Sequence, residues 1–184
     1  VSVAELSVRE YPTGPTMGQI LGFTGSIPRG DLDEYLDDDY QIYDVVGRDG
    51  IEATYERYLR GTKGQKIVEI DATGREQRQI GETRAPVPGY SLHLTIDLEF
   101  QRAVEVALAE GLRRTHARSG AVVALDPRDG SVRALVSLPN YDNNLFSLGA
   151  RPSDFADLLE DPDRPLVNRA IAGLYAPGST FKLI

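Results

Sequence analysis

The clearest hydrophobic pattern in the chain lies at residues 97–114, "DLEFQRAVEVALAEGLRR". Apolar and small residues recur there every three or four positions, which places them on one face of an α-helix. Asp97 stands where its carboxylate can accept hydrogen bonds from the first backbone N–H groups of that helix. We therefore predict a long helix that begins after Asp97 and packs through Phe100, Val104, Ala107, Leu108 and Gly111.

Alternating apolar positions on both sides of this helix predict β-strands. "YSLHLTI" at residues 90–96 has the pattern of one strand, and His93 is most simply a histidine on a strand face rather than a metal ligand or a base. "GAVVALDPRDGSVRALVSLP" at residues 120–139 predicts a hairpin whose turn contains Pro127 and Gly130. The second half thus begins with a strand, a long helix and a β-hairpin.

The first half shows shorter patterns. Alternation from Val1 to Val8 predicts one or two short strands that end at Pro12. "GIEATYERYLRG" at residues 50–61 predicts an amphipathic helix that packs through Ile51, Tyr55, Tyr58 and Leu59 and ends at Gly61. "KIVEIDATGREQRQI" at residues 66–80 predicts a second hairpin, with its turn at Ala-Thr-Gly.

A polar, proline-bearing stretch, "GETRAPVPG" at residues 81–89, separates the two halves and is typical of a linker. We place a domain boundary there, with one domain at residues 1–88 and a second at residues 89–184. Both contain helices and strands that do not alternate regularly, so the predicted fold class is α+β.

Composition narrows the possible functions. The chain has 28 acidic and 20 basic residues and a formal net charge of -8, which argues against nucleic acid as a partner. It has no cysteine and two histidines, so we expect no metal site and no cofactor. The acidic run at residues 31–44 lacks the ordered spacing of a calcium loop and is interpreted as a solvated helix and its edge.

The last ten residues, "YAPGSTFKLI", place Ser179 and Lys182 three positions apart after a Pro-Gly pair. If the pair breaks the chain before a helix, Ser179 lies in the first turn, where free N–H groups favour negative charge. Residues three apart share a helix face, so the lysine amine can reach the serine hydroxyl. Lysine can act as a base once it is desolvated, whereas arginine cannot.

Spacing alone leaves two interpretations open. With ten serines and three lysines in 184 positions, about 0.16 such pairs are expected by chance. Ser179 and Lys182 are therefore either a nucleophile and its base, or the start of a surface helix whose lysine extends into water.

Longer blocks carry a family resemblance over nearly the whole chain. "NRAIAGLYAPGSTFK" at residues 168–182 resembles the nucleophile region of penicillin-binding transpeptidases, whose first motif is S-x-x-K. "GRDGIEATYERYLRGTKGQKIVEIDATGRE" at residues 47–76 resembles the pedestal, or dimerisation, domain of class B penicillin-binding proteins. "REYP" and "LGFTGSI" are most similar to the elongation-type penicillin-binding protein 2.

The resemblance implies a fold, a reaction and a set of partners. Residues 1–88 would form the pedestal and residues 89–184 the first part of the transpeptidase domain. Ser179 would be the acyl-accepting nucleophile, and Lys182 would be its general base. The backbone N–H of Ser179 would form half of the oxyanion hole. Implied ligands are peptidoglycan stem peptides that end in D-Ala-D-Ala and β-lactams, and implied partners are cell-wall elongation proteins.

The later family motifs, S-x-N and K-T-G, do not follow Ser179 before Ile184. We expect the chain to be an inactive fragment of an extracytoplasmic domain, anchored to the bacterial membrane only through a segment upstream of Val1. We also expect residues 90–184 to self-associate. Two alternatives remain: a class D-like β-lactamase or β-lactam sensor, and a pedestal that acts as a noncatalytic interaction module.

Overall fold

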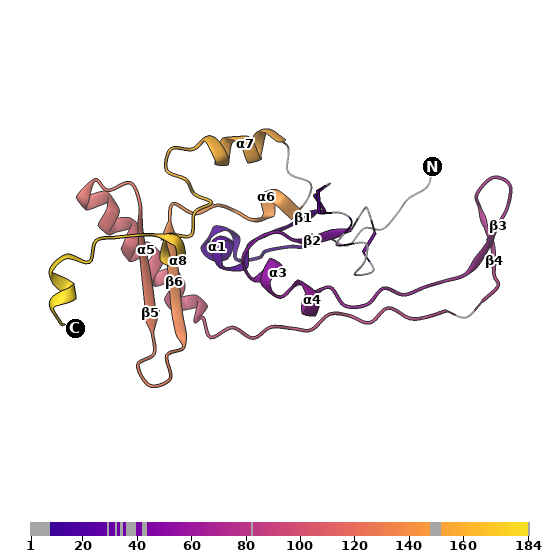
Figure 1. The fold of residues 1–184 in the computed structure, drawn as a ribbon, viewed down its shortest axis with the longest axis horizontal. Coiled ribbons are helices and arrows are strands. Elements are labelled where there is room, and N and C mark those ends of the chain that lie inside the picture. Colours follow the sequence, from indigo (N-terminus) through magenta and orange to yellow (C-terminus); the bar gives the residue numbers. More distant parts are fainter. Residues whose placement is uncertain are drawn as a thin grey trace.

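The computed structural model describes residues 8–28, 30–31, 33, 35, 40–41, 44–81, 83–147 and 152–183. Figure 1 shows a mixed body of small helices and two-stranded sheets, from which a long, narrow arm extends to one side. The arm ends in the hairpin of β3 and β4, and the C-terminal segment runs away from the body on the opposite side. The predicted α+β class is confirmed.

A β-hairpin covered by one long helix forms the most regular part of the body. β5 (Gly120–Leu125) pairs antiparallel with β6 (Val132–Leu138), as predicted. α5 (Leu98–Thr115) packs along β6 and begins where expected, since an Asp97 side-chain oxygen accepts a hydrogen bond of 3.1 Å from the Phe100 N–H. The helix ends at His116, which adopts the left-handed conformation with φ of 54°.

The predicted buried face of α5 is partly wrong. Phe100 is 44% exposed, whereas Gln101 is almost completely buried at 1% exposure. The Gln101 side chain donates to the Leu135 carbonyl at 2.7 Å and accepts from the Leu135 N–H at 2.8 Å. A glutamine that replaces a strand partner in this way can face the interior, because both ends of its amide are satisfied.

The strand predicted at residues 90–96 is also wrong. A strand needs a ladder of partners, and this segment makes backbone hydrogen bonds mainly at its two ends. The Tyr90 N–H donates to the Tyr58 carbonyl and the Asp97 N–H to the Arg133 carbonyl, and the Thr95 hydroxyl donates to the Val132 carbonyl. His93 lies on this irregular segment and is exposed.

The N-terminal part of the body consists of short elements in chain order. They are η1 (Gly14–Met17), α1 (Gly18–Leu21), β1 (Thr24–Ser26), β2 (Val45–Gly47), α3 (Gly50–Thr54) and α4 (Glu56–Leu59). β1 pairs antiparallel with β2, and a small core of Ile27, Tyr40 and Val46 lies beside them. Residues 8–11 form no strand, and Val1 to Ser7 and most of the acidic run lie outside the described residues.

The helix predicted at residues 50–61 is present but divided at Tyr55 into α3 and α4. Tyr55 and Tyr58, which were expected to be buried, are 41% and 57% exposed, while Glu52 is buried. The Glu52 carboxylate is held by the Arg9 guanidinium at 2.8 and 3.1 Å, so ion pairing rather than apolar packing decides which face turns inward.

The arm is an antiparallel ribbon. The hairpin of β3 (Val68–Ile70) and β4 (Glu76–Gln79) is confirmed, and isolated pairs at Thr62–Val87 and Gln65–Arg84 continue it toward the body. The segment predicted as a linker, residues 81–89, thus pairs with the outgoing side of the arm at Arg84 and Val87, and most of its described residues are exposed, which fits its polar composition.

The remaining helices are α6 (Asn144–Ser147), α7 (Pro152–Glu160), α8 (Arg169–Ala172) and η2 (Gly178–Leu183). α6 packs on the N-terminal part through Phe146, which stacks on Phe23 with centroids 4.0 Å apart, and Tyr141, which precedes α6, meets Phe23 edge-on at 6.4 Å. Among the helices described, none is both long enough and apolar enough to cross a membrane.

Candidate active site

Ser179 and Lys182 both lie in η2, near the end of the C-terminal segment, and both are exposed to solvent. η2 is a 3-10 helix, in which residues three apart eclipse one another along the axis. The hydroxyl and the amine therefore leave the same side of this short helix. Gly178, with φ of 57°, makes the turn into it in a conformation that favours glycine.

The segment that leads to Ser179 is attached to β6 immediately before α8. The buried Ser137 hydroxyl accepts a hydrogen bond of 3.0 Å from the Arg169 N–H and lies 3.3 Å from the Val167 carbonyl, to which it donates. The Asn168 side chain caps α8 by accepting from the Ala170 N–H at 3.2 Å. Sequence reasoning missed both residues, although an Asn before a short apolar helix is a capping signal.

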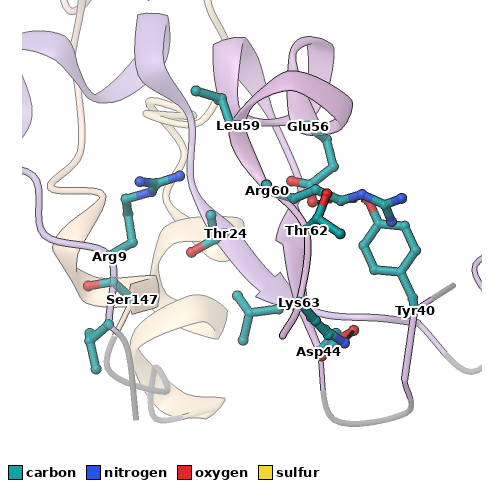
Figure 2. A pocket seen from close by; sticks show the side chains of 13 residues that line it. Arg9, Thr24, Tyr40, Asp44, Glu56, Leu59, Arg60, Thr62, Lys63 and Ser147 are labelled. Atoms are coloured by element: carbon teal, nitrogen blue, oxygen red, sulfur yellow. Dashed lines mark hydrogen bonds and ion pairs between the residues drawn. The ribbon is translucent and has the colours of Figure 1, made fainter. Parts of the chain in front are cut away.

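A cavity of about 360 Å³ lies at the base of the arm, far along the chain from Ser179. Figure 2 shows its polar lining, with Arg9 and Thr24 on one side and Tyr40, Asp44, Glu56 and Lys63 on the other. The Tyr40 hydroxyl donates to Glu56 at 3.1 Å, and Arg60 lies over the Tyr40 ring at 4.2 Å. Among the described residues that line the cavity, these charged side chains are paired with neighbours, which suits a structural role.

The protonation of Tyr40 and the ion pair of Lys63 also indicate a structural role for the side chains of this cavity. Burial and the neighbouring Glu56 carboxylate raise the pKa of Tyr40 to about 12, so its hydroxyl stays protonated at neutral pH. Lys63 forms an ion pair with Asp44. Thr62 and Lys63 thus lie where the arm joins the body, with Thr62 paired to Val87 across the arm.

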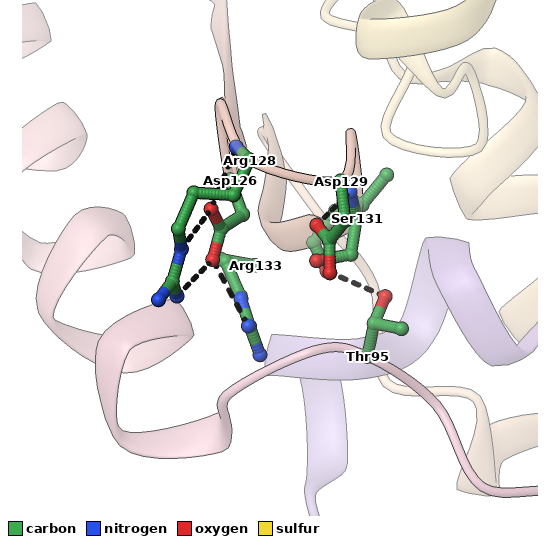
Figure 3. Close-up of polar contacts among 7 residues, drawn as sticks. Thr95, Asp126, Arg128, Asp129, Ser131 and Arg133 are labelled. Atoms are coloured by element: carbon green, nitrogen blue, oxygen red, sulfur yellow. Dashed lines mark hydrogen bonds and ion pairs between the residues drawn. The ribbon is translucent and has the colours of Figure 1, made fainter.

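A second polar cluster stabilises the β5–β6 turn (Figure 3). Asp126 accepts from the Arg128 guanidinium at 2.7 and 3.0 Å and from Arg133 at 3.1 Å. These hydrogen bonds hold the pKa of the Asp126 carboxyl far below its ordinary range. The Asp129 carboxylate accepts from the Ser131 N–H in the same turn. Carboxylates that accept hydrogen bonds within a turn and have a lowered pKa suit a structural role rather than acid–base catalysis.

Comparison with known families identifies the family to which the chain belongs. The family model of the penicillin-binding protein dimerisation domain matches residues 1–94, which is just over half of the chain. The chain belongs to the penicillin-binding proteins. The transpeptidase domain model of the same proteins matches residues 120–184, a span that contains both Ser179 and Lys182.

Relatives among characterised penicillin-binding proteins align with almost the entire chain. The peptidoglycan D,D-transpeptidase MrdA of Haemophilus influenzae is 44% identical over 95% of this chain, and MrdA of Escherichia coli K12 is 40% identical over 99%. Penicillin-binding protein 3 of Bacillus subtilis is 35% identical over the full chain. The chain spans only 26–28% of the length of these relatives.

Solved structures give the same assignment. Penicillin-binding protein 2 of Pseudomonas aeruginosa matches 95% of this chain with a TM-score of 0.76 and 38% identity, over 33% of its own length. Penicillin-binding protein 2 of Helicobacter pylori, in a complex with MreC, matches 97% with a TM-score of 0.75 and 30% identity, over 31% of its length. The predicted likeness to penicillin-binding protein 2 is confirmed. The roles of Ser179 and Lys182 stay predictions.

Proposed function

We propose that the protein to which this chain belongs is a peptidoglycan D,D-transpeptidase in which Ser179 is the nucleophile and Lys182 its general base. The observation that carries the proposal is the S-x-x-K motif within the span matched by the transpeptidase family, with both side chains on one side of η2. The MrdA relatives, which are named as D,D-transpeptidases, support the same reaction.

The proposed reaction has two acyl transfers. Lys182 accepts the hydroxyl proton while Ser179 Oγ attacks the penultimate D-alanine carbonyl of a stem peptide, and the Ser179 N–H donates to the resulting oxyanion. The peptide bond breaks, and the terminal D-alanine leaves after taking up the proton. An amine of a neighbouring stem peptide then attacks the ester, forms the cross-linking amide and frees Ser179.

Acylation of the full-length protein by a fluorescent penicillin tests these roles. We expect Ser179→Ala to abolish labelling and Lys182→Ala to lower its rate by at least about a hundredfold, in the range of lost base catalysis. Ser153→Ala and Lys63→Ala are matched controls elsewhere in the chain and should label normally. Equal labelling of Ser179→Ala and the unaltered protein would refute the proposal.

The same assay separates transpeptidase from hydrolase chemistry. A class D-like β-lactamase or a sensor would carry the same S-x-x-K motif, yet the match to the dimerisation domain over residues 1–94 favours the transpeptidase. We expect the labelled full-length protein to keep its acyl group for many minutes. Rapid release of hydrolysed penicillin would favour the β-lactamase instead.

We infer that the 184-residue chain by itself is inactive. Ser179 and Lys182 are open to water here, and a lysine acts as a base for acyl transfer when its surroundings exclude water. The isolated chain should therefore show no penicillin labelling under conditions that label the full-length protein completely.

A binding role for the arm and its base rests on a separate observation. Apolar side chains are exposed along this region, among them Tyr55, Tyr58, Ile67, Ile80 and Val87. Ile67 and Ile80 lie opposite each other across the arm, where the Ile80 N–H donates to the Ile67 carbonyl, and neighbouring exposed apolar side chains are a feature of protein-binding surfaces. Because the Helicobacter pylori relative was solved with MreC, we propose that this region docks a cell-wall elongation protein of that kind.

The docking role is tested by surface plasmon resonance. The measurement is binding of this protein to the MreC protein of the bacterium that produces it. Ile67→Asp combined with Ile80→Asp should weaken binding at least about tenfold, because it places two charges on the proposed contact. Val106→Asp, an exposed apolar position on α5, is the matched control. Equal binding by both variants would exclude the arm as the contact.

The division into a pedestal at residues 1–88 and a catalytic part at residues 89–184 belongs to the same proposal, as does an extracytoplasmic location on a membrane-anchored protein. Limited proteolysis of the folded chain, with identification of the first cleavage sites, tests the boundary. First cleavage within residues 81–97 agrees with it, and first cleavage within α5 contradicts it.

A further inference from the structure

A buried glutamine in the N-terminal part touches the segment that leads to Ser179. Gln19 lies in α1 and is 8% exposed. Its side-chain Nε2 lies 2.5 Å from the Pro165 carbonyl oxygen, 3.2 Å from that of Val167 and 3.3 Å from that of Pro139, and its two N–H groups are shared among these acceptors. Three surrounding carbonyls accept only, so the amide nitrogen rather than the oxygen must face them.

A further hydrogen bond joins the same two segments, with the donor on residues 165–168 and the acceptor on α1. The Asn168 side chain donates to the Gln19 backbone carbonyl at 3.3 Å while its oxygen caps α8. Residues 165–168 are thus held by α1 through Gln19 and by β6 through Ser137. The two elements come from opposite halves of the chain, and between them they set where α8 begins.

Apolar packing contributes little to the position of α8. The helix has four residues, too few to be stable by itself, and its largest apolar side chain, Ile171, is 75% exposed. A cavity of about 490 Å³, lined by Gln19, Ile20, Ile51, Asn168 and Ile171 among others, separates it from α1 and α3. Hydrogen bonds at its first turn therefore restrain this helix in addition to its contacts with β5 and β6.

We propose that Gln19 is a positioning residue for acyl transfer: through residues 165–168 it sets the place of α8 and thereby of the short segment that ends at Ser179. The proposal rests on the assignment of Ser179 as the nucleophile. Displacement of a nucleophile by about 1 Å can lower the rate about a hundredfold, so loss of this restraint should reduce acylation without touching the reacting atoms.

The first test is Gln19→Met in the full-length protein, since methionine keeps the side-chain length and removes the donors. Gln101→Met is a closely matched control: Gln101 is also a buried glutamine that donates to backbone carbonyls, but it attaches α5 rather than the approach to Ser179. The rate of labelling by a fluorescent penicillin is measured over a range of drug concentrations and expressed per folded molecule, with the folded fraction taken from circular dichroism.

We expect Gln19→Met to lower the maximal acylation rate per folded molecule about 10- to 100-fold, while Gln101→Met lowers the melting temperature but leaves that rate within about twofold. An unchanged rate in Gln19→Met, or an equal loss in Gln101→Met, would overturn the proposal. If the unaltered protein is not labelled at Ser179, the proposed function fails instead, so the two failures are distinguishable.

Asn168→Asp keeps the proposal testable if Gln19→Met does not fold. Aspartate retains the oxygen that caps α8 but lacks the N–H groups that donate to the Gln19 carbonyl. It should slow acylation about three- to tenfold with little change in melting temperature, and a normal rate in this variant would contradict the proposal.

Discussion

Three buried polar residues connect parts of this chain that are far apart in the sequence. Gln19, Glu52 and Gln101 are each buried, and each is satisfied by a partner far away in the sequence. Binary patterning assigns such residues to the surface, so the faces predicted for α5 and α3 are wrong at the positions where polar side chains turn inward. Nothing local identifies them, because their partners are brought near only by folding.

Arg9 should be important for stability because it neutralises the buried Glu52 carboxylate at 2.8 Å. We expect Arg9→Met to lower the free energy of unfolding by about 1–3 kcal/mol, since it leaves a buried acceptor without its charged partner. Urea denaturation of the 184-residue chain measures the loss.

Two further variants separate ion pairing from loss of bulk at Arg9. Adding Glu52→Gln to Arg9→Met should recover part of the stability, because the buried group is then neutral. Arg113→Met removes an exposed pair with Glu110 on α5 and should leave unfolding unchanged within error. A loss in Arg113→Met as large as that in Arg9→Met would show that burial is not the reason.

At the level of secondary structure, elements with strong local signals formed where they were predicted. α5 and the two hairpins each combine a hydrophobic period with a cap or turn residue, such as Asp97, Gly74 or Gly130. The segment at residues 90–96 has the alternating apolar pattern of a strand, but among the described residues it forms no continuous series of backbone hydrogen bonds with a neighbouring strand. Strand formation depends on such a partner, which local sequence does not supply.

The Asp97 cap should carry a measurable share of the stability of α5. We expect Asp97→Ala to lower the free energy of unfolding by about 1 kcal/mol, because the Phe100 N–H loses its acceptor. Asp97→Asn keeps an acceptor oxygen and should cost less than half as much in the same urea experiment. Equal losses would mean that charge rather than capping matters at this position.

The turn of the arm's hairpin should respond to acid. Hydrogen bonds from Thr73 and Arg75 lower the pKa of Asp71 to about 2, from an ordinary value near 3.8. A carboxylate with a depressed pKa stabilises the folded turn above about pH 4, and this contribution is lost as the pH falls toward 2.

The Thr73 amide resonance in NMR spectra reports this titration directly. We expect it to shift with a midpoint near pH 2, and the shift should be missing from Asp71→Asn measured over the same pH range. The variant also separates local titration from acid unfolding of the whole chain. A midpoint near pH 4 would show that the turn does not hold the carboxylate.

As a whole molecule, the chain exposes far more surface than a compact protein of its size. Its accessible area is 13824 Å², whereas a compact monomer of 20.2 kDa exposes roughly 8,800 Å² by the usual scaling. The narrow arm contributes to this area, and apolar side chains such as Val106, Leu125, Ile171 and Leu174 lie open to solvent. Surface of this kind becomes stable when another protein surface covers it.

We therefore expect the 184-residue chain to self-associate through its second half. Light scattering should show a mass above 20.2 kDa that increases with concentration. Val106→Lys with Leu125→Lys should reduce the association, because the variant places charge on two exposed apolar positions, whereas Arg102→Lys should not change it. A monodisperse monomer at all concentrations would contradict this expectation.

The amino-acid sequence by itself determined the family, the α+β class, the long helix and the two hairpins, and it supplied Ser179 and Lys182 as candidate catalytic residues. These follow from motifs and periods that lie within short stretches of chain. Tertiary structure alone decided that Glu52 and Gln101 face inward, that residues 81–89 return along the arm and that Gln19 holds the approach to Ser179. Each of these depends on a partner distant in sequence, and hydrogen-bond satisfaction between distant segments is not encoded in any local pattern.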